Sequence, residues 1–590
     1  MSKHGELPEL AAAVLQPGFV GTTAPDWIRR RLAEGLGGVA LFARNVESPA
    51  QVAALTAQLR AERPDVIVAI DEEAGDVTRF ESRDGSSRPG NLALGAIDDP
   101  LLTEAVARDL GCELAAAGIT LDYAPDADVN NNPDNPVIGV RAFGAEPHLV
   151  ARHAAAFVRG LQTYGVAACA KHFPGHGDTA VDSHHDVPLI DRTAEELAAN
   201  ELVPFRAAIA AGAKVVMTGH LLVPAYDNDL PATLSPRILT GLLRDELGFD
   251  GLIVTDGIEM QGVRRRFGLA GATVRALAAG VDAICVGGDH ADEETALHLR
   301  DAIVAAVLSG ELPEARLRDA VARVRALGAW TTRTQKEAGV VRGPQPASEI
   351  GFNAARRAVR VTRAESGPEL PVAGVPHVVE FAPPRNIAIG EETPWGIGAP
   401  LAALLPGTTA IRLSADDHPT STLSLTALLP TSGLSNGSLS NGHSSADGLS
   451  ADGLSGGGLP ADGLPADGLA VDGLSNGDLS ADGLSNRGLS AGDLSADGLA
   501  GPADAASLVL AGAAGRPLIL VVRDVHRHRW IADILDVVLE TRPDAIVVEM
   551  GIPVKVLGGV HVATFGATRA CGQAAAELIA GANIPEPVAA

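Results

Sequence analysis

Short apolar runs alternate with amphipathic stretches through the first half of the chain, from Ala11 to Gly288. The stretches between the runs have apolar residues at helical spacing, as in residues 147–165. This repeat predicts a (β/α)8 barrel of the TIM type, although a doubly wound sheet would show the same alternation. The eight strand-like runs are residues 11–18, 37–45, 66–73, 119–125, 165–173, 214–220, 251–257 and 283–288.

The polar residues favour the barrel. Asp71, Lys171, His172, His220 and Asp256 each lie where a strand-like run ends. The carboxyl ends of barrel strands form one face of the domain, and barrel enzymes place their chemistry there. We therefore expect the site at that face of a domain covering residues 1–330.

A second domain is expected after a polar linker, residues 331–346, that contains Gly and Pro. Strand-like runs resume beyond it and predict a smaller α/β sandwich over residues 347–590. These runs are residues 377–382, 409–414, 506–512, 517–524, 544–551 and 562–567.

A low-complexity segment, residues 432–500, interrupts the second domain. Leucine recurs every five residues from Leu434 to Leu499, missing only at Ser444, in units such as Ser-Ala-Asp-Gly-Leu. Gly-rich units with little apolar content resist ordering, so we expect a disordered insertion. An ordered pentapeptide solenoid is the alternative.

Composition narrows the functional classes. The chain has 46 basic and 73 acidic residues, a net charge of −27, which disfavours binding to nucleic acid or to an anionic membrane surface. No apolar run is long enough to span a membrane or to form a secretory signal. The four cysteines form no Cys-x-x-Cys pair. We expect a cytoplasmic protein without membrane insertion and, since no phosphate loop or similar motif stands out, without a cofactor.

The densest group of chemically useful residues is KHFPGHGDTAVDSHHD, residues 171–186. Its Gly and Asp content predicts a loop above the barrel mouth, where titratable groups serve acid–base catalysis. A solvated loop without special function is one alternative. A metal site is another, with the possible ligands His172, His176, Asp178, Asp182 and His184, but Pro174 and Gly175 would break any helix aligning the first two.

A second signal is the strand-like run of residues 251–257, in which Asp256 lies at the carboxyl end and is followed by Gly257. A glycine there would allow a substrate to approach closely. Alternatively, Asp256 opens a turn or caps the next helix. We expect Glu259 in the first turn of that helix, where a carboxylate interacts favourably with the helix dipole.

Together, KHFPGHGDTAVDSH (171–184) and IVTDGIEM (253–260) resemble the bacterial β-N-acetylglucosaminidases of glycoside hydrolase family 3. The resemblance covers residues 10–330, approximately, in collinear order. It extends to IDEEAGDVTRF (70–80) and to residues 124–144, 217–227 and 230–251.

The resemblance implies roles by position. Asp256 matches the nucleophile of a retaining double displacement, and His184 matches an acid/base oriented by Asp182. An imidazole suits that role because its pKa lies near neutrality and its neutral form adds no second negative charge beside Asp256. The residues alone do not distinguish His184 from His185.

Other positions match residues that bind the sugar. The resemblance implies that Asp71, Arg141, Lys171 and His172 bind hydroxyls of a terminal N-acetylglucosamine. Asp128 and His220 also lie in matching segments at strand ends, where the alternative is a structural polar network under the pocket. The usual Asp-x-Glu-Gly-Gly-Arg segment is altered here, because Ala74 replaces a glycine and Asp76 replaces a basic residue.

The resulting expectation is a β-N-acetylhexosaminidase that releases non-reducing terminal N-acetylglucosamine from a carbohydrate such as a muropeptide fragment. A β-glucosidase or chitooligosaccharide hydrolase is the alternative within enzymes. Outside enzymes, the alternative is a non-catalytic sugar-binding protein.

Overall fold

The computed structural model describes most of both halves of the chain. The described residues are 6–179, 187–288, 290–346, 348–384, 386, 388–390, 393–415, 423–428 and 501–582. Asp182, His184, His185 and the insertion expected at 432–500 lie outside them.

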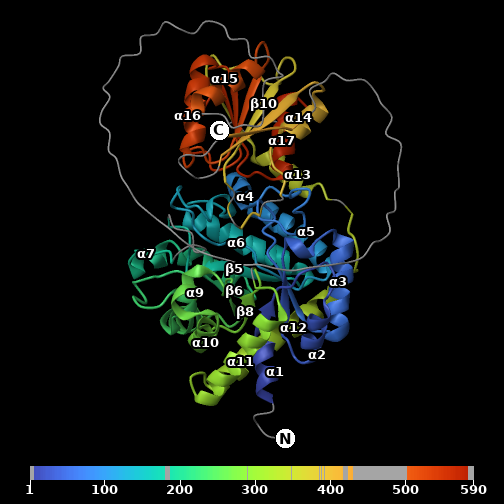
Figure 1. Cartoon of the computed structure of the whole chain (residues 1–590), viewed down its shortest axis with the longest axis vertical. Coiled ribbons are helices and arrows are strands. Elements are labelled where there is room, and N and C mark those ends of the chain that lie inside the picture. The colour runs from blue at the N-terminus through green and yellow to red at the C-terminus, as the bar shows by residue number, and fades with distance from the viewer. Residues whose placement is uncertain are drawn as a thin grey trace, which may run out of the picture. The chain divides into compact units, whose positions relative to one another are not determined.

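The first half contains a curled parallel sheet (Figure 1). Six strands are hydrogen-bonded in chain order, from β2 to β7, and β1 pairs in parallel with β8. A parallel bridge between Val254 and Ala283 links the seventh strand to the segment entering the eighth. The strands are β1 (Leu15–Pro17), β2 (Gly38–Leu41), β3 (Ile67–Ile70), β4 (Leu121–Asp122), β5 (Ala167–Phe173), β6 (Val215–Thr218), β7 (Leu252–Thr255) and β8 (Ile284–Val286).

Helices follow these strands and cover the sheet. Every residue of the eight strands is buried, as expected for parallel strands enclosed by helices. The helices are α1 (Leu7–Ala13), α2 (Asp26–Ala33), α3 (Pro49–Glu62), α4 (Asn91–Ile97), α5 (Pro100–Ala117), α6 (Pro147–Leu161), α7 (Ala194–Ala199), α8 (Leu202–Ala210), a π-helix (Arg237–Glu246), α9 (Gln261–Phe267), α10 (Leu269–Ala279), α11 (Glu293–Ser309) and α12 (Glu314–Glu337).

Local sequence explains where these helices begin and end. At the start of α5, the Asp99 side chain accepts a hydrogen bond from the backbone N–H of Leu102, and Pro100 takes the first helical position. The helix ends at Gly118, whose φ of 88° is accessible to glycine at little cost.

The second half contains a seven-stranded sheet of order β12-β11-β10-β13-β14-β15-β9, with antiparallel strands at its two edges. Successive residues of β10 enter different cores, because Val378 packs with α14 and α17 and Val379 packs with α15 and α16. Helices therefore cover both faces (Figure 1). The elements are α13 (Ile350–Ala358), β9 (Arg360–Arg363), β10 (His377–Ala382), α14 (Gly398–Leu404), β11 (Thr409–Ser414), β12 (Ser424–Ala427), α15 (Pro502–Gly512), β13 (Leu518–Val522), α16 (Arg529–Thr541), β14 (Ile546–Glu549), β15 (Val560–Ala563) and α17 (Arg569–Ala580).

Three details differ from the expectations. The run 506–512 is helical, within α15, because Pro502 starts a helix that its many alanines favour. The run 11–18 begins in α1, and only Leu15–Pro17 is a strand. Helix α12 continues to Glu337, so the connection without regular structure is shorter than the expected linker 331–346.

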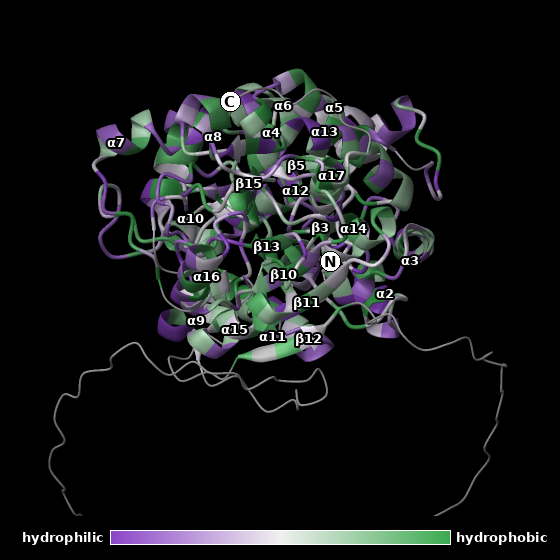
Figure 2. Ribbon diagram, turned by 90° about the horizontal axis from the view of Figure 1, so that it is seen from above, coloured by the Kyte–Doolittle hydropathy of each residue, from purple (hydrophilic) through white to green (hydrophobic). Residues whose placement is uncertain are grey.

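Apolar residues lie mainly on the strands, whereas outer helices such as α7 and α9 carry many hydrophilic residues (Figure 2). No helix among the described residues combines the length and apolar character needed to cross a membrane.

Asp76 joins the two halves, which belong to one compact unit. Its carboxylate accepts hydrogen bonds from Arg523, at 2.6 Å, and from the backbone N–H of Ala567, at 2.8 Å. The Arg523 guanidinium also stacks over the ring of Trp395, 5.5 Å from its centroid. The acidic residue at this position is therefore explained by a contact with the second half of the chain.

Candidate active site

A cavity of about 390 Å³ opens among residues at the carboxyl ends of the first sheet's strands. This size is in the range of small-molecule sites. Its lining includes the predicted residues Asp71, Arg141, Lys171, His172 and Asp256. Also in the lining are Phe42, Arg79, Tyr123, His176, Met217, Glu259, Cys285 and, from the second half of the chain, Ala388.

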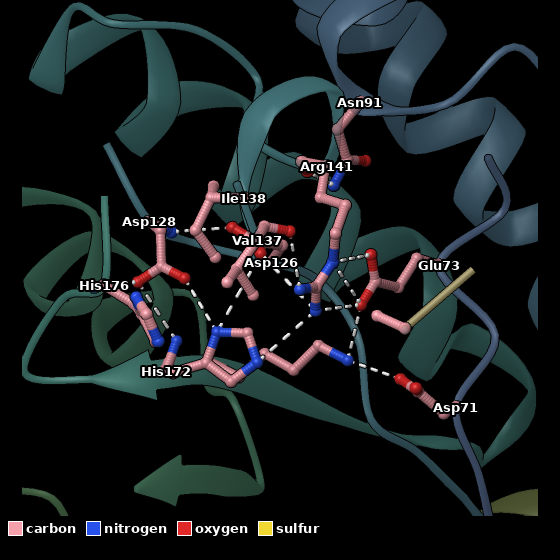
Figure 3. Close-up of polar contacts among 12 residues, drawn as sticks. Asp71, Glu73, Asn91, Asp126, Asp128, Val137, Ile138, Arg141, His172 and His176 are labelled. Carbon is pink, nitrogen blue, oxygen red and sulfur yellow. Dashed lines mark hydrogen bonds and ion pairs between the residues drawn. The ribbon is translucent and has the colours of Figure 1, made fainter. Parts of the chain in front are cut away.

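One wall of the cavity is a cluster of opposite charges (Figure 3). Lys171, within β5, forms ion pairs with Asp71, just after β3, and with Glu73, at 2.6 Å. Arg141 donates two hydrogen bonds to Glu73, from Nε at 2.9 Å and from Nη2 at 2.7 Å. Burial raises the pKa of Glu73, but Arg141 and Lys171 outweigh burial and lower it to about 2. The cluster therefore stays ionised near neutral pH, and its charges are fixed in place before a ligand arrives.

Asp71 has a second partner, Arg79, that connects the wall to the second half of the chain. Arg79 donates to Asp71 at 3.1 Å and to the carbonyl oxygen of Ala388 at 2.6 Å. The side chain of Asn386 donates to the carbonyl oxygen of Val137 at 2.7 Å. These hydrogen bonds hold the segment that contains Asn386 and Ala388 at the edge of the cavity.

His172 is held in one tautomer by its neighbours. Its Nδ1 lies 2.7 Å from a carboxylate oxygen of Asp128, and its Nε2 lies 3.4 Å from Nη2 of Arg141. A guanidinium can only donate, so Nε2 accepts and Nδ1 donates its hydrogen to Asp128. Asp128 also accepts from the backbone N–H of His172 and His176, which makes it a support for the cavity wall (Figure 3).

Three described side chains offer possible metal ligands close together. Ligand atoms of Asp126, Asp128 and His172 lie within 4.8 Å of one another. Both nitrogens of His172 are already used, towards Asp128 and Arg141. Burial, followed by the charge of Asp128, raises the pKa of Asp126 well above its usual range, which disfavours the ionised form that a cation would require. The set therefore fits a hydrogen-bonded support better than a cation site.

Asp256 lies directly after β7, in the lining of the cavity. Its Oδ1 accepts the backbone N–H of Gly257 at 2.8 Å. His220 fixes the same turn, with Nε2 3.0 Å from the carbonyl oxygen of Gly257 and Nδ1 2.8 Å from the Thr233 hydroxyl. His220 thus shapes the loop that presents Asp256.

The structure brings together the predicted residues that it describes. Glu73, Arg79 and Glu259 were not predicted as site residues. Glu73 could have been suspected, since it follows Asp71 by two residues in the quoted segment. Nothing near Ala388 in the sequence points to the cavity, because its position depends on contacts between distant segments.

The model of the "Glycosyl hydrolase family 3 N terminal domain" matches residues 21–327. This is more than half of the chain. The chain belongs to glycosyl hydrolase family 3.

Curated relatives match slightly less than half of the chain. A beta-hexosaminidase from Nitrosomonas eutropha is 41% identical over 286 residues, which are 47% of this chain and 81% of the relative. Beta-hexosaminidase A from Pseudoalteromonas piscicida is 38% identical over 283 residues, 44% of this chain. This chain spans only 47% of that relative's length.

Solved structures extend the likeness to both halves. A family 3 beta-N-acetylglucosaminidase from Paenibacillus sp. str. FPU-7 superposes with a TM-score of 0.75 at 28% identity, covering 98% of this chain and 96% of that one. A beta-N-acetylhexosaminidase from Beutenbergia cavernae has a TM-score of 0.50 at 32% identity, covering 55% of this chain and 98% of that one. Some similar structures therefore cover nearly the whole of this chain and others only about half of it.

Proposed function

We propose that this family 3 protein is a retaining exo-glycosidase that releases terminal β-linked N-acetylglucosamine. The observation that supports it most is the cavity whose lining contains Asp256 together with Asp71, Lys171 and Arg141 of the ionised cluster. The names of the curated relatives and of the Paenibacillus structure support the choice of sugar. Muropeptide fragments are the proposed natural source, on the family resemblance alone.

The proposed chemistry assigns one task to each part of the cavity. Asp71, Arg141 and Lys171 bind sugar hydroxyls, since ionised donors and acceptors make strong hydrogen bonds to them. His172 binds a further hydroxyl through Nε2, which exchanges its 3.4 Å contact with Arg141 for the sugar. Asp256 attacks C1 and forms a covalent glycosyl-enzyme, which water then hydrolyses. This proposal also takes the eight parallel strands to form a (β/α)8 barrel, with the cavity at the carboxyl ends of its strands.

Two nitrophenyl glycosides test the proposed function. We expect turnover of 4-nitrophenyl β-N-acetylglucosaminide with kcat/KM at least about tenfold above that of the β-glucoside. Preference for the glucoside would favour a β-glucosidase. Binding of N-acetylglucosamine without turnover of either substrate would favour a sugar-binding protein.

His184 is the proposed acid/base, oriented by Asp182; both lie outside the described residues. His184→Ala is expected to lower kcat/KM about 100-fold or more for substrates with poor leaving groups, and far less for nitrophenyl glycosides. A nitrophenolate departs without a proton, which masks the loss in the first step. The measurement is a plot of log(kcat/KM) against the pKa of the leaving group.

His185→Ala is the matched control, and Asp182→Ala is expected to follow His184→Ala more weakly. A larger effect at His185, or equal losses for all leaving groups, would contradict the assignment of His184.

A further inference from the structure

The sequence context of Glu259 predicted a place in the first turn of a helix, but the structure places this residue before the helix. Helix α9 begins at Gln261 with Met260 as its cap, so Glu259 precedes it. Its side chain lines the cavity that contains Asp256, and only 8% of the residue is exposed.

The two carboxylate oxygens of Glu259 have different surroundings. Oε1 accepts hydrogen bonds from the backbone N–H of Gly287, at 2.9 Å, and of Gly288, at 2.5 Å. Oε2 is buried and has no hydrogen-bond partner among the described residues. Leaving a buried carboxylate oxygen unpaired costs free energy. A side chain fixed at one oxygen and unpaired at the other, on a cavity wall, is suited to accept a hydrogen from a ligand.

The position of Glu259 restricts which part of a sugar it can reach. The ionised cluster comes from β3, β5 and the loop after β4, whereas Glu259 lies three residues beyond Asp256 and is held by the backbone after β8. A pyranose whose hydroxyls bind the cluster and whose C1 faces Asp256 therefore presents to Glu259 the groups next to C1. These are the ring oxygen, which has no hydrogen, and the substituent at C2.

We propose that Glu259 binds the C2 substituent of the sugar, its Oε2 accepting the N–H of a 2-acetamido group. The proposal rests on the proposed function and adds a specificity-determining residue to it. A carboxylate forms a charge-assisted hydrogen bond with this N–H, and the bond is strengthened by the low exposure of the site.

Glu259→Gln is the sharpest test. Its amide oxygen must remain on Gly287 and Gly288, which places the NH2 group where Oε2 was and sets a donor against the donor at C2. We expect kcat/KM to fall about 10- to 100-fold for 4-nitrophenyl β-N-acetylglucosaminide. For the 2-deoxy-β-glucoside, which has no donor at C2, we expect a loss of at most about threefold.

Equal losses on both substrates, or no loss on either, would overturn the proposal, because Glu259 would then act only on the shape of the Asp256 loop or not at all. Glu294→Gln, the same substitution at an exposed position of α11, is the control. If Glu259→Gln does not fold, Glu259→Asp retracts the carboxylate by one methylene and must show the same selectivity for substrates with a C2 donor.

Calorimetry separates this proposal from the proposed function. The dissociation constant of N-acetylglucosamine should rise at least about tenfold in Glu259→Gln, while that of 2-deoxyglucose stays within about threefold. If the wild-type protein hydrolyses neither glycoside, the proposed function fails, but these two constants still decide the role of Glu259. Equal changes in the two dissociation constants would overturn the proposed role of Glu259.

Discussion

Asp256→Asn is expected to lower kcat for 4-nitrophenyl β-N-acetylglucosaminide by about three orders of magnitude or more. The substitution keeps the size of the side chain and its acceptor for the Gly257 N–H, which Oδ1 now binds at 2.8 Å. It removes the charge with which the carboxylate would attack C1. Steady-state kinetics with a fluorogenic substrate of the same sugar would extend the measurable range.

Asp250→Asn is the matched control, because Asp250 precedes the same strand and its side chain is fully exposed. We expect it to keep wild-type kinetics. If Asp256→Asn retains more than about a tenth of the activity, another group is the nucleophile.

Glu73→Gln should cost both stability and activity. Glu73 is 3% exposed and is shared by Arg141 and Lys171, so its neutralisation leaves two buried cations short of a counterion. Removing one partner of a buried ion pair costs about 3–5 kcal/mol of unfolding free energy. We expect the free energy of unfolding to fall by about 3 kcal/mol, the lower end of this range, since Asp71 still pairs with Lys171. The kcat/KM should fall at least about 100-fold, because both cations are proposed to bind the sugar.

Chemical denaturation of both proteins measures this loss, and its pH dependence identifies the source. The pKa of Glu73 is lowered to about 2 in the folded protein, so its contribution is complete above its usual pKa of 4.5 and disappears as the pH falls from there towards 2. The difference in unfolding free energy between Glu73→Gln and the wild type should therefore shrink as the pH falls over the same range. Glu62→Gln, at the exposed pair with Arg29, should cost less than about 1 kcal/mol; an equal cost for both would contradict the role of burial.

The sequence predicted the first sheet well because buried parallel strands leave a strong local signal. All eight expected runs contain a strand, and in residues 11–18 the strand follows a helical start. The run 506–512 failed because a short apolar segment does not distinguish a strand from a buried helix. Its flanking Pro502 was the available signal for a helix.

The candidate site was predictable where its residues lie at strand ends. Asp71, Lys171, His172 and Asp256 met that condition, and the structure places all four in one cavity. Glu259 was misjudged because its partners, the backbone N–H groups of Gly287 and Gly288, are 28 and 29 residues away in the chain. Arg79 and Ala388 are 309 residues apart, and no local pattern encodes such a contact.

The buried contact of Asp76 limits how this chain could be divided into separate domains. The Beutenbergia cavernae structure is 98% covered by 55% of this chain, so that structure has no counterpart to the remaining part of this chain. Removing the residues from 347 onward would nevertheless leave Asp76 without its hydrogen bonds from Arg523 and from the Ala567 N–H. It would also remove the Ala388 carbonyl oxygen that accepts a hydrogen bond from Arg79. The first half therefore depends on the second for these contacts. Grafting it onto another partner, or engineering it as a minimal enzyme, would require redesign of position 76 and of the support for Arg79 before any change to the cavity.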